Sequence, residues 1–368
     1  MPETSSYCAS NLKFVLIAGE QSGDNHGFAL MKALHKQEPH LSFSGVGGKK
    51  MCSLFKDTYL NAEDLHMMGF SGVILALPKL YGLLKSLSAR ILKEKPEAVI
   101  TIDFPDFNLQ LSKMLRKKGY TGRLIHYISP SVWAWRKGRV KMMAKYLDLL
   151  LTIFPFEADY FRGSGLKTVY VGNPTAVIED PPLPTKEPLI AIFPGSRLSA
   201  IKANLPLQLA AARRTGLKIA ISLANDKARH LMPDDVEIVP EKERHRLMRR
   251  AQMALATSGT IALEMALRGL PTVCTYQISR LNYFVAYHLF RIRRDFYVMP
   301  NILLKRMLVP EIIGCDLEED RVTAALELLS EEEAKKGAQE LAQTLHIQDN
   351  NPSSQAAKEI LYATLLST

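Results

Sequence analysis

The stretch "GNPTAVIEDPPLPTKEP", residues 172–188, divides the chain into two halves. It contains five prolines and no periodic apolar pattern. Such a stretch is typical of a linker, because proline cannot donate the backbone hydrogen bond that helices and strands use. The 368 residues are enough for two domains of ordinary size. We therefore predict a first domain over residues 1–172, a linker over 173–188 and a second domain over 189–345.

Short apolar runs alternate with helical patterns in both halves. The strand candidates of the first half are Leu12–Ala18, Leu41–Val46, Ala98–Ile102, Arg123–Ile128, Leu149–Ile153 and Thr168–Val171. Those of the second half are Leu189–Phe193, Leu217–Leu223, Val236–Val239, Met253–Ala256 and Thr272–Tyr276. Apolar strands separated by helices indicate a parallel sheet that is covered on both faces. We predict an α/β fold with two Rossmann-like domains facing across a cleft. A last helix, at residues 353–366, is expected to pack back on the first domain.

The composition is that of a folded globular protein, with 47% apolar and 23% charged residues. The four cysteines lie far apart, which disfavours a disulfide framework or a zinc site and fits a reducing cytosol. The start of the chain lacks the pattern of a secretory signal, and the apolar stretches are shorter than the roughly 20 residues that span a bilayer. We expect a protein that is soluble or rests on a membrane.

The net charge of +10 has two interpretations. The first is a solvated basic surface, and the second is an anionic partner such as nucleic acid, a phosphorylated substrate or acidic lipid headgroups. Basic clusters occur at residues 136–139, 249–250 and 291–294, but no aromatic residues are interleaved as in a nucleic-acid-binding arm. We expect no nucleic-acid partner.

Polar residues follow the strands of the first half, where ligands of parallel sheets bind. "GEQSGD" (19–24) is either a cleft site or a glycine turn in which Asp24 caps a helix. "TIDFPDFN" (101–108) carries Asp103 and Asp106, which are helix caps or the chemistry itself. "YISPSVWAW" (127–135) holds both tryptophans, either as packing or as a platform for a sugar or an acyl group.

The second half carries two strand-to-helix turns of small polar residues. "PGSR" (194–197) suits a diphosphate, because backbone N–H groups bind its oxygens and the guanidinium group neutralises its charge. In "TSGTIALEMA" (257–266), Glu264 lies one helical turn beyond the Ser-Gly-Thr turn and can accept both hydroxyls of a ribose. Helix caps look similar, but together the two turns suggest a bound nucleotide.

Several other kinds of site are disfavoured. The P-loop pattern is absent, and "GVGGKK" (45–50) does not match the dinucleotide fingerprint. The sequence contains neither a DxD triplet nor the spacing of a metal site. We expect neither a metal ion nor an organic cofactor.

The stretch over residues 67–95 is apolar and then amphipathic. Its periodic apolar residues include Val73, Ile74, Leu77, Leu80, Tyr81 and Leu84, with lysines and an arginine around them. It is either a core helix of the first domain or a helix that rests in a lipid interface, and Pro78 should kink or split it.

These residues resemble those of lipid-A-disaccharide synthases. The motifs stand in the same order: "AGEQSGD", "MGFSGV", "IDFPDFN", "YISPSVWAWR", "FPFE", "VGNP", "PGSR", "TSGTIALE" and "MPNILLKRMLVPE". The resemblance runs from Lys13 to Leu329, and "SPSVWAW" together with "IDxPDFN" is specific to the family rather than to its fold.

The resemblance implies a GT-B-type inverting glycosyltransferase that needs neither metal ion nor cofactor. The donor would be UDP-2,3-diacylglucosamine and the acceptor 2,3-diacylglucosamine 1-phosphate, giving a β-1,6-linked disaccharide phosphate and UDP. The family works at the cytoplasmic face of the inner membrane, and the basic excess of this chain suits such an anionic surface. Relatives can form dimers, so a homodimer is compatible with the resemblance.

The resemblance also assigns roles to residues. Asp103 would be the base that takes the proton from the acceptor hydroxyl, and Asp106 a helix cap. The UDP-sugar would be held by Gly195, Ser196, Arg197, Ser258, Gly259, Thr260, Glu264 and Asn301. The acceptor side or the cleft would be lined by Gly19, Glu20, Ser22, Gly23, Asp24, Ser129 and Trp133. The periodic residues of the 73–84 stretch would touch membrane and acyl chains.

The sequence departs from the family at one position and leaves other points open. Relatives usually carry Glu where this chain has Ala200, which weakens donor binding if that Glu orders Arg197. The acceptor phosphate has candidates in Arg291, Arg293 and Arg294, which can equally form a solvated helix end. An alternative is another UDP-sugar enzyme of the same fold, such as a different lipid-linked glycosyltransferase or an epimerase.

Overall fold

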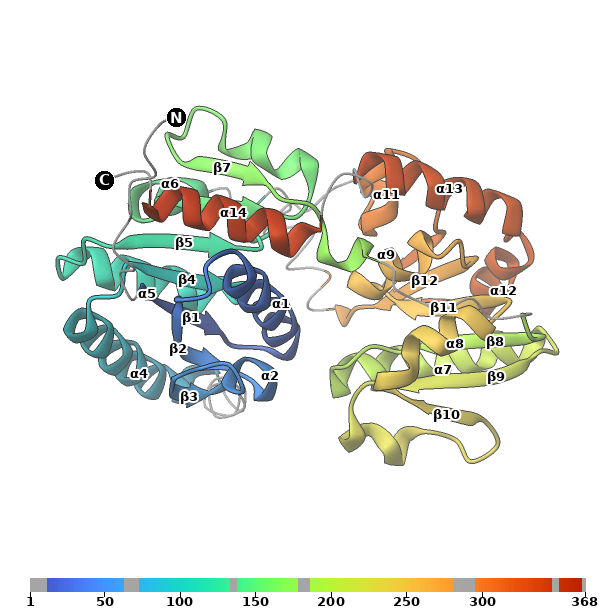
Figure 1. The fold of residues 1–368 in the computed structure, drawn as a ribbon. Helices are drawn as coiled ribbons and strands as arrows, with labels where there is room; N and C mark the ends of the chain where they lie inside the picture. Colours follow the sequence, from blue (N-terminus) through green and yellow to red (C-terminus); the bar gives the residue numbers. More distant parts are fainter. Residues whose placement is uncertain are drawn as a thin grey trace. The chain divides into compact units, whose positions relative to one another are not determined.

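The computed structural model describes residues 12–62, 73–132, 138–177, 186–280, 283, 295–345 and 351–365, without the side chains of Gln21 and residues 73–77. The chain forms two compact units. The first comprises Met1–Pro174 and Asp349–Thr368, and the second comprises Thr175–Gln348. Each has its own parallel sheet, which confirms the predicted α/β class (Figure 1).

The first unit contains a seven-stranded sheet whose neighbouring strands are all parallel. The strand order is β3 (Asp57–Asn61), β2 (Ser42–Gly47), β1 (Lys13–Ala18), β4 (Ala98–Ile102), β5 (Arg123–Tyr127), β6 (Leu149–Thr152) and β7 (Lys167–Tyr170). The order runs outward in both directions from β1 and β4. These two central strands therefore flank the point where a ligand crevice forms in such sheets.

Helices cover both faces of this sheet because its strands are apolar on both sides. In β1, Phe14 and Leu16 pack on one face, and Val15 and Ile17 pack on the other. The first face carries α1 (Gln21–Gln37), α2 (Lys49–Cys52) and α14 (Pro352–Leu365). The second carries α4 (Val73–Glu94), α5 (Pro105–Lys117), α6 (Gly138–Tyr146) and the 3-10 helix η1 (Pro155–Phe161). A second short 3-10 helix, η2, covers Pro174–Ala176.

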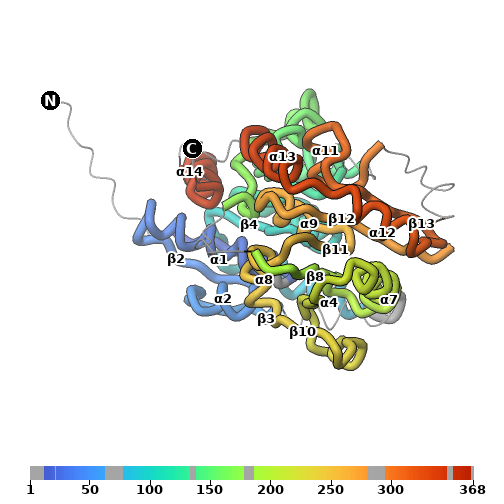
Figure 2. Tube along the Cα trace, turned by 90° about the vertical axis from the view of Figure 1, so that its right-hand side faces the viewer, coloured from blue at the N-terminus to red at the C-terminus, as the bar shows by residue number. Residues whose placement is uncertain are grey.

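The last helix lies in the first unit although it follows the second unit in the chain. Ala356, Ala357 and Ile360 of α14 pack in the same buried cluster as Leu30 and Leu34 of α1. The side-chain amide of Gln37 donates to the Ser354 carbonyl at 2.9 Å. Figures 1 and 2 show the red α14 beside the blue α1. The small side chains of Ala356 and Ala357 therefore let α14 pack closely beside α1 on the first sheet.

The second unit repeats the strand order in a six-stranded parallel sheet. The order is β10 (Glu237–Pro240), β9 (Lys218–Leu223), β8 (Leu189–Phe193), β11 (Met253–Thr257), β12 (Thr272–Gln277) and β13 (Glu311–Gly314). Its described helices are α7 (Leu198–Arg214), α8 (Arg244–Arg250), α9 (Thr260–Leu267), α11 (Met299–Leu304), α12 (Glu319–Glu327) and α13 (Glu331–Thr344), with 3-10 helices η3 (Asp226–Leu231) and η4 (Glu241–Glu243). The strands β8 and β11 take the central positions that β1 and β4 have in the first unit.

The structure differs from the sequence prediction at the sheet edges. The edge strands β3 and β13 were not predicted, because each is short and β3 exposes most of its residues. The segment over 241–250, between β10 and β11, begins as η4 and continues as α8. The helix α4 continues through Pro78. Among the residues described, no helix combines the length and the apolarity that a bilayer crossing requires.

Candidate active site

The predicted site residues lie at the carboxyl ends of the four central strands. Residues 19–24 follow β1, and Asp103 follows β4. In the second unit, residues 194–197 follow β8 and residues 257–260 end β11 and begin α9. In a sheet of this strand order, ligands bind where the connections diverge between the two central strands. Each unit therefore carries predicted site residues at its own divergence point.

The turn that carries Asp103 has an unusual backbone. Asp103 and Phe104 have φ values of +48° and +47°, and Ile128, at the end of the neighbouring β5, has +71°. Left-handed backbone at residues with side chains costs energy and gathers at functional sites. The Asp103 N–H donates to the Tyr127 carbonyl at 3.0 Å, so the turn is tied to the end of β5.

Asn108 holds this turn from the first turns of α5. Its side-chain amide donates to the Asp103 carbonyl at 2.7 Å and to the Ile102 carbonyl at 3.3 Å. The side chain is fully buried, and its Oδ1 has no hydrogen-bond partner among the residues that the structure describes. Asn108 belongs to the "IDFPDFN" motif, yet the sequence analysis assigned it no role. The sequence feature that could have pointed to its role is its position in the motif, shortly after Asp103.

The carboxyl group of Asp103 is more basic than an ordinary aspartate. Burial raises its pKa, the nearby Glu20 carboxylate raises it further, and the Phe104 backbone N–H opposes both effects. A raised pKa makes a carboxylate a better proton acceptor near neutral pH. The geometry and the charge around Asp103 thus suit a general base.

Asp106 does not cap α5, and that prediction is wrong. The residue at the N-cap is Phe104, in the left-handed conformation, and Pro105 begins the helix. Asp106 lies in the first turn, exposed, and forms an ion pair with Arg139 of α6. An acid in this position is favoured by the helix dipole without acting as a cap. The other acid of the motif, Asp103, is the one with a raised pKa caused by burial.

The turn after β1 divides into accessible and structural residues. Ser22 is exposed and Glu20 is half-buried, whereas Gly23 lies where an added Cβ would meet the Ala18 Cβ at 3.2 Å. Asp24 is buried and accepts the backbone N–H groups of Lys50 at 3.2 Å and Met51 at 3.0 Å. Asp24 therefore caps α2, a different helix from the one that contains it. This carboxylate is committed to the fold.

Ser129 is buried and donates to the Pro130 carbonyl at 3.2 Å. Trp133 lies outside the described residues, as do Arg291, Arg293 and Arg294. His126, which the sequence analysis did not single out, is fully buried in β5, and its Nδ1 lies 2.8 Å from the Thr101 hydroxyl. Burial lowers the pKa of His126 to about 4, so the ring is neutral at physiological pH.

The two turns of the second unit are joined to each other. The Thr257 hydroxyl donates to the Pro194 carbonyl at 3.0 Å, and the Gln208 amide donates to the hydroxyls of Thr257 at 3.3 Å and Thr275 at 3.0 Å. Gly195 has a φ of +93° and faces Thr257. These buried contacts hold the glycine turn after β8 against the one after β11.

Small and charged groups at these turns remain accessible. Ser196, Arg197, Gly259 and Thr260 are exposed, and Ser258 is half-buried. Gly259 is the N-cap residue of α9 and has extended backbone, with a φ of 169°. The first N–H groups of a helix have no partner within it, so the starts of α7 and α9 offer donors to an anion.

Arg197 has no acidic partner within the described part of the chain. At Ala200, where relatives usually carry Glu, the backbone carbonyl accepts the Asn204 side-chain amide at 2.9 Å. The Asn204 Oδ1 in turn accepts the Gln277 N–H at 2.8 Å. The start of α7 is thus anchored by Asn204, which does not depend on the side chain at position 200.

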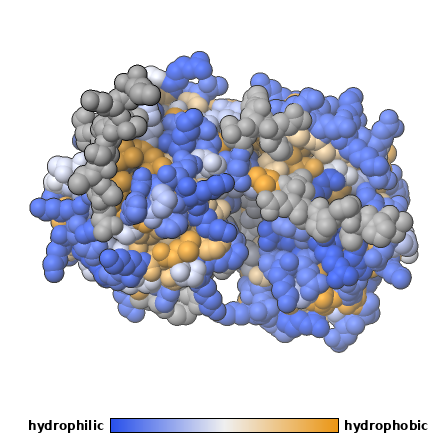
Figure 3. Space-filling view, viewed as in Figure 1, coloured by the Kyte–Doolittle hydropathy of each residue, from blue (hydrophilic) through white to orange (hydrophobic). Residues whose placement is uncertain are grey.

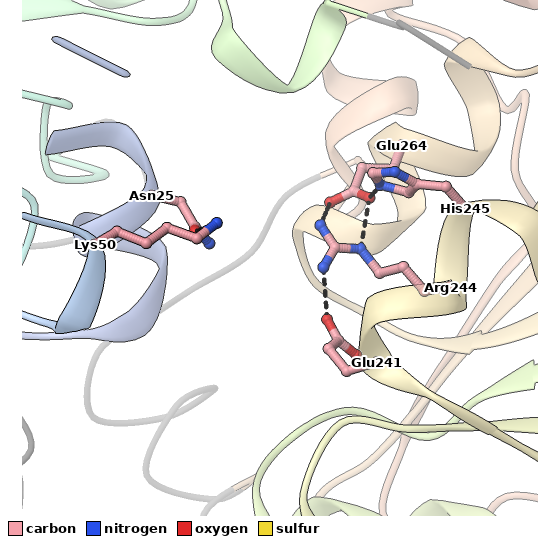
Figure 4. Close-up of polar contacts among 6 residues, drawn as sticks. All are labelled: Asn25, Lys50, Glu241, Arg244, His245 and Glu264. Carbon is pink, nitrogen blue, oxygen red and sulfur yellow. Dashed lines mark hydrogen bonds and ion pairs between the residues drawn. The ribbon is translucent and has the colours of Figure 1, made fainter. Parts of the chain in front are cut away.

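Glu264 lies in a charged cluster with two residues of α8 (Figure 4). Its Oε2 accepts Arg244 Nε at 3.1 Å and lies 3.0 Å from His245 Nε2, and its Oε1 accepts Arg244 Nη2 at 3.4 Å. Burial raises the pKa of Glu264, but the hydrogen bond from His245 and the charge of Arg244 outweigh that effect and lower it. The carboxylate is therefore ionised. Sequence reasoning missed both partners, which lie about 20 residues away.

Asn301 is buried, and its side chain is engaged within the unit. Its Nδ2 donates to the Val309 carbonyl at 2.7 Å and to Glu311 at 3.2 Å, and its Oδ1 accepts the N–H groups of Leu308 and Val309. These contacts close the loop between α11 and β13. Asn301 could contact a ligand only if some of them were broken, and its assignment to donor binding stays a prediction.

The predicted membrane stretch is partly a core helix. Leu84 is 6% exposed and packs with Leu87 and Ile91, and Leu80 is half-buried against the same cluster. The prediction that Leu84 contacts lipid is therefore corrected. Tyr81 is 63% exposed. The side chains of Val73, Ile74 and Leu77 lie outside the described ones. In Figure 3, hydrophilic residues cover most of the described surface on the face shown, with apolar patches between them.

The chain matches known sequences over most of its length. The family model described as lipid-A-disaccharide synthetase matches residues 14–365. A lipid-A-disaccharide synthase of Chlamydia trachomatis serovar D is 40% identical over 94% of this chain, and the chain spans 61% of that relative's length. A lipid-A-disaccharide synthase of Saccharophagus degradans is 35% identical over 95% of this chain and 96% of its own length.

Solved structures share the two-sheet architecture. The UDP-GlcNAc 2-epimerase of Methanocaldococcus jannaschii, in complex with UDP-GlcNAc and UDP, has a TM-score of 0.60 at 13% identity over 95% of this chain and 99% of its own. The calicheamicin glycosyltransferase CalG4 has the same TM-score and identity over 97% and 98%. This likeness confirms a GT-B-type fold. Since the family model spans the described sheets and the Saccharophagus degradans relative is matched over nearly its whole length, the chain belongs to the lipid-A-disaccharide synthetase family.

Proposed function

We propose that this protein is a lipid-A-disaccharide synthase. It transfers 2,3-diacylglucosamine from its UDP derivative to 2,3-diacylglucosamine 1-phosphate, and it forms the β-1,6-linked disaccharide 1-phosphate and UDP. The observation that carries the proposal is Asp103, a carboxyl group of raised pKa on a strained turn at the divergence point of the first sheet. Membership of the family gives that carboxyl group its reaction.

The proposed reaction is a single in-line displacement. The Asp103 carboxylate takes the proton from the 6-hydroxyl of the acceptor, and the oxygen forms a bond to the anomeric carbon of the donor sugar. The bond between that carbon and the UDP phosphate breaks, and UDP leaves with the electron pair. Attack from the face opposite to the leaving group inverts the anomeric centre.

The second unit supplies the groups that the leaving diphosphate requires. Arg197 is exposed beside the glycine turn after β8, and the start of α9 offers N–H groups next to it in the sheet. Preorganised donors of this kind stabilise charge that develops on a leaving group. Glu264, one helical turn into α9, supports the prediction that the ribose lies beside that helix.

The substrates of the proposed reaction carry acyl chains, so the enzyme must work at a lipid surface. We propose that it lies on the cytoplasmic face of the inner membrane and contacts anionic lipid through the start of α4. Tyr81, Lys79 and Lys85 are exposed on that helix, as an interfacial contact requires. A homodimer stays a prediction.

A detergent-micelle assay with both diacylated substrates tests the proposal. UDP release and the mass of the product are followed for the parent protein and for Asp103→Ala. Disaccharide phosphate from the parent and none from the variant is the expected result. UDP released without disaccharide would instead favour another UDP-sugar enzyme of this fold, such as an epimerase or a different lipid-linked glycosyltransferase.

A further inference from the structure

Glu264, the predicted ribose ligand, contacts two basic side chains of its own unit, Arg244 and His245. Arg244 contacts Glu264 through two nitrogens and donates a third hydrogen bond to Glu241 at 2.7 Å. Both Arg244 and His245 come from α8, while Glu264 comes from α9 (Figure 4). The cluster therefore fixes one helix of the candidate donor site against another.

The contacts are distributed unequally over the two carboxylate oxygens. Oε2 takes Arg244 Nε at 3.1 Å and His245 Nε2 at 3.0 Å, which fills both of its lone-pair positions. Among the described residues, Oε1 takes only the longer contact from Arg244 Nη2, at 3.4 Å. The acceptor capacity that remains on Glu264 is therefore concentrated on Oε1.

Glu264 also lies at a distance from the start of α9 that suits a ribose attached to a diphosphate bound there. Thr260 is the first residue of α9, and Glu264 stands four residues later on the same side of the helix. Residues four apart are separated by about 6 Å along a helix. A diphosphate at the start of α9 therefore places its attached ribose beside Glu264.

We propose that Arg244 and His245 are positioning residues for the ribose of a uridine nucleotide and act through Glu264. They saturate Oε2, keep the carboxylate ionised within the protein and leave Oε1 to accept a ribose hydroxyl. This inference rests on the proposed function, because it takes the nucleotide from there. It concerns the basic segment over 244–250, whose Arg249 and Arg250 the sequence analysis counted among charged surface clusters.

The test compares UDP with 2′-deoxy-UDP and 3′-deoxy-UDP by isothermal titration calorimetry. The parent should bind UDP roughly tenfold or more tightly than at least one deoxy nucleotide, because a hydrogen bond to a charged acceptor is lost. In Arg244→Gln, the affinity for UDP should fall toward that of the deoxy nucleotide, whose own affinity should change little. His245→Gln should show a smaller loss of the same preference, because it removes one contact of three.

Two further variants control for structure and charge. Arg214→Gln removes an arginine of the same unit that pairs with Asp320 on the surface, and it should leave the preference unchanged. Arg244→Lys keeps the charge and one contact to Glu264, so it should recover part of the preference. Far-UV circular dichroism verifies that each variant is folded.

The outcomes separate this inference from the proposed function. A parent that does not bind UDP contradicts both. A parent that binds UDP and both deoxy nucleotides equally, or an Arg244→Gln that weakens all three nucleotides by the same factor, overturns the positioning role alone. If Arg244→Gln does not fold, the preference of Arg244→Lys decides, and an unchanged preference there overturns the inference.

Discussion

The two units have the same strand order, but the backbone conformation at the ends of their central strands differs. In the first unit, Asp103, Phe104 and Ile128 have left-handed φ values at the ends of β4 and β5. In the second unit, the turn after β8 instead has glycine at its left-handed position, Gly195, with a φ of +93°. At these strand ends the first unit therefore has side chains on left-handed backbone, where the second unit has glycine.

The difference follows from what each turn must present. A left-handed residue with a Cβ costs about 1–2 kcal/mol, which glycine does not incur. The second unit offers backbone N–H groups, and glycine exposes these best. In the proposed reaction the first unit presents a carboxylate, and glycine at position 103 would have none. We infer that the strain at Asp103 is retained because the proposed reaction requires a side chain there.

Asp103→Asn should produce the largest effect, because it removes the carboxylate that the turn of the first unit presents. The rate of disaccharide formation should fall by about 10²–10⁴-fold, the usual contribution of a general base. Thermal stability near neutral pH should rise. The folded pKa of Asp103 lies above its unfolded value, so stability decreases as pH rises through that window, and asparagine removes the charged form. Steady-state kinetics and thermal unfolding at pH 7.5 measure both effects.

Asp106→Asn is the matched control, because it changes an acid three residues away in the same motif. Its carboxylate is exposed and pairs with Arg139, so the rate should change by less than about twofold. A large loss of rate in Asp106→Asn together with a small one in Asp103→Asn would reverse the assignment.

Acid should weaken the first unit through His126. The folded pKa of about 4 lies below the ordinary 6.5, so the unfolded chain binds more protons between these values, and stability is lost as pH falls through that window. At pH 5 the loss is about 2 kcal/mol relative to neutral pH. In His126→Gln this part of the loss should disappear.

Urea unfolding followed by far-UV circular dichroism measures this effect at pH 7.5 and at pH 5. The difference in stability between pH 7.5 and pH 5 should shrink in His126→Gln. An unchanged difference would show that other groups carry the acid sensitivity.

The sequence predicted the buried strands more completely than the contacts among the candidate site residues. Apolar runs such as Ala98–Ile102 and Leu189–Phe193 match the observed strands residue for residue, because continuous burial leaves a strong pattern. The edge strands β3 and β13 leave a weak one. Strand ends followed by glycines and acids marked the candidate site residues, and in each unit these residues follow the central strands.

The partners of the site residues could not be predicted in the same way. Asp24 caps α2, and Asn301 closes the loop before β13, through contacts that depend on the folded backbone rather than on local pattern. The pairing of Glu264 with Arg244 joins two helices across a connecting strand. The left-handed turn at Asp103 has no glycine to mark it. The sequence alone therefore shows which polar residues follow the strands, and the structure shows which of them already form hydrogen bonds within the protein.

Asn108→Ala should release the strained turn after β4 and keep the Asp103 carboxyl group, so it tests the turn separately from the acid. The variant loses the hydrogen bonds to the Ile102 and Asp103 carbonyls, so the carboxylate should be held less accurately. The kcat should fall by about 10–100-fold with little change in KM, as for a small misplacement of a reacting group.

Ser112→Ala is its control on the same helix. The Ser112 hydroxyl is buried and donates to the Asn108 carbonyl at 3.0 Å, so its hydrogen bond lies within the helix. It should lower stability by about 1 kcal/mol and leave kcat unchanged. Equal kcat losses in the two variants would mean that helix stability, rather than the turn, sets the rate.

Gly195→Ala should give the smallest effect and tests the other side of the comparison. An alanine Cβ at position 195 would lie 3.7 Å from the Thr257 Cβ, an ordinary contact, so only the left-handed backbone costs energy, about 1–2 kcal/mol. Gly216→Ala has the same cost, because Gly216 has a φ of +68° and open space around it, away from the candidate site. Both variants should lose similar stability by far-UV circular dichroism, while Gly195→Ala alone should weaken UDP binding. If Gly216→Ala weakens it equally, the glycine at position 195 serves the fold of the second unit and not its ligand.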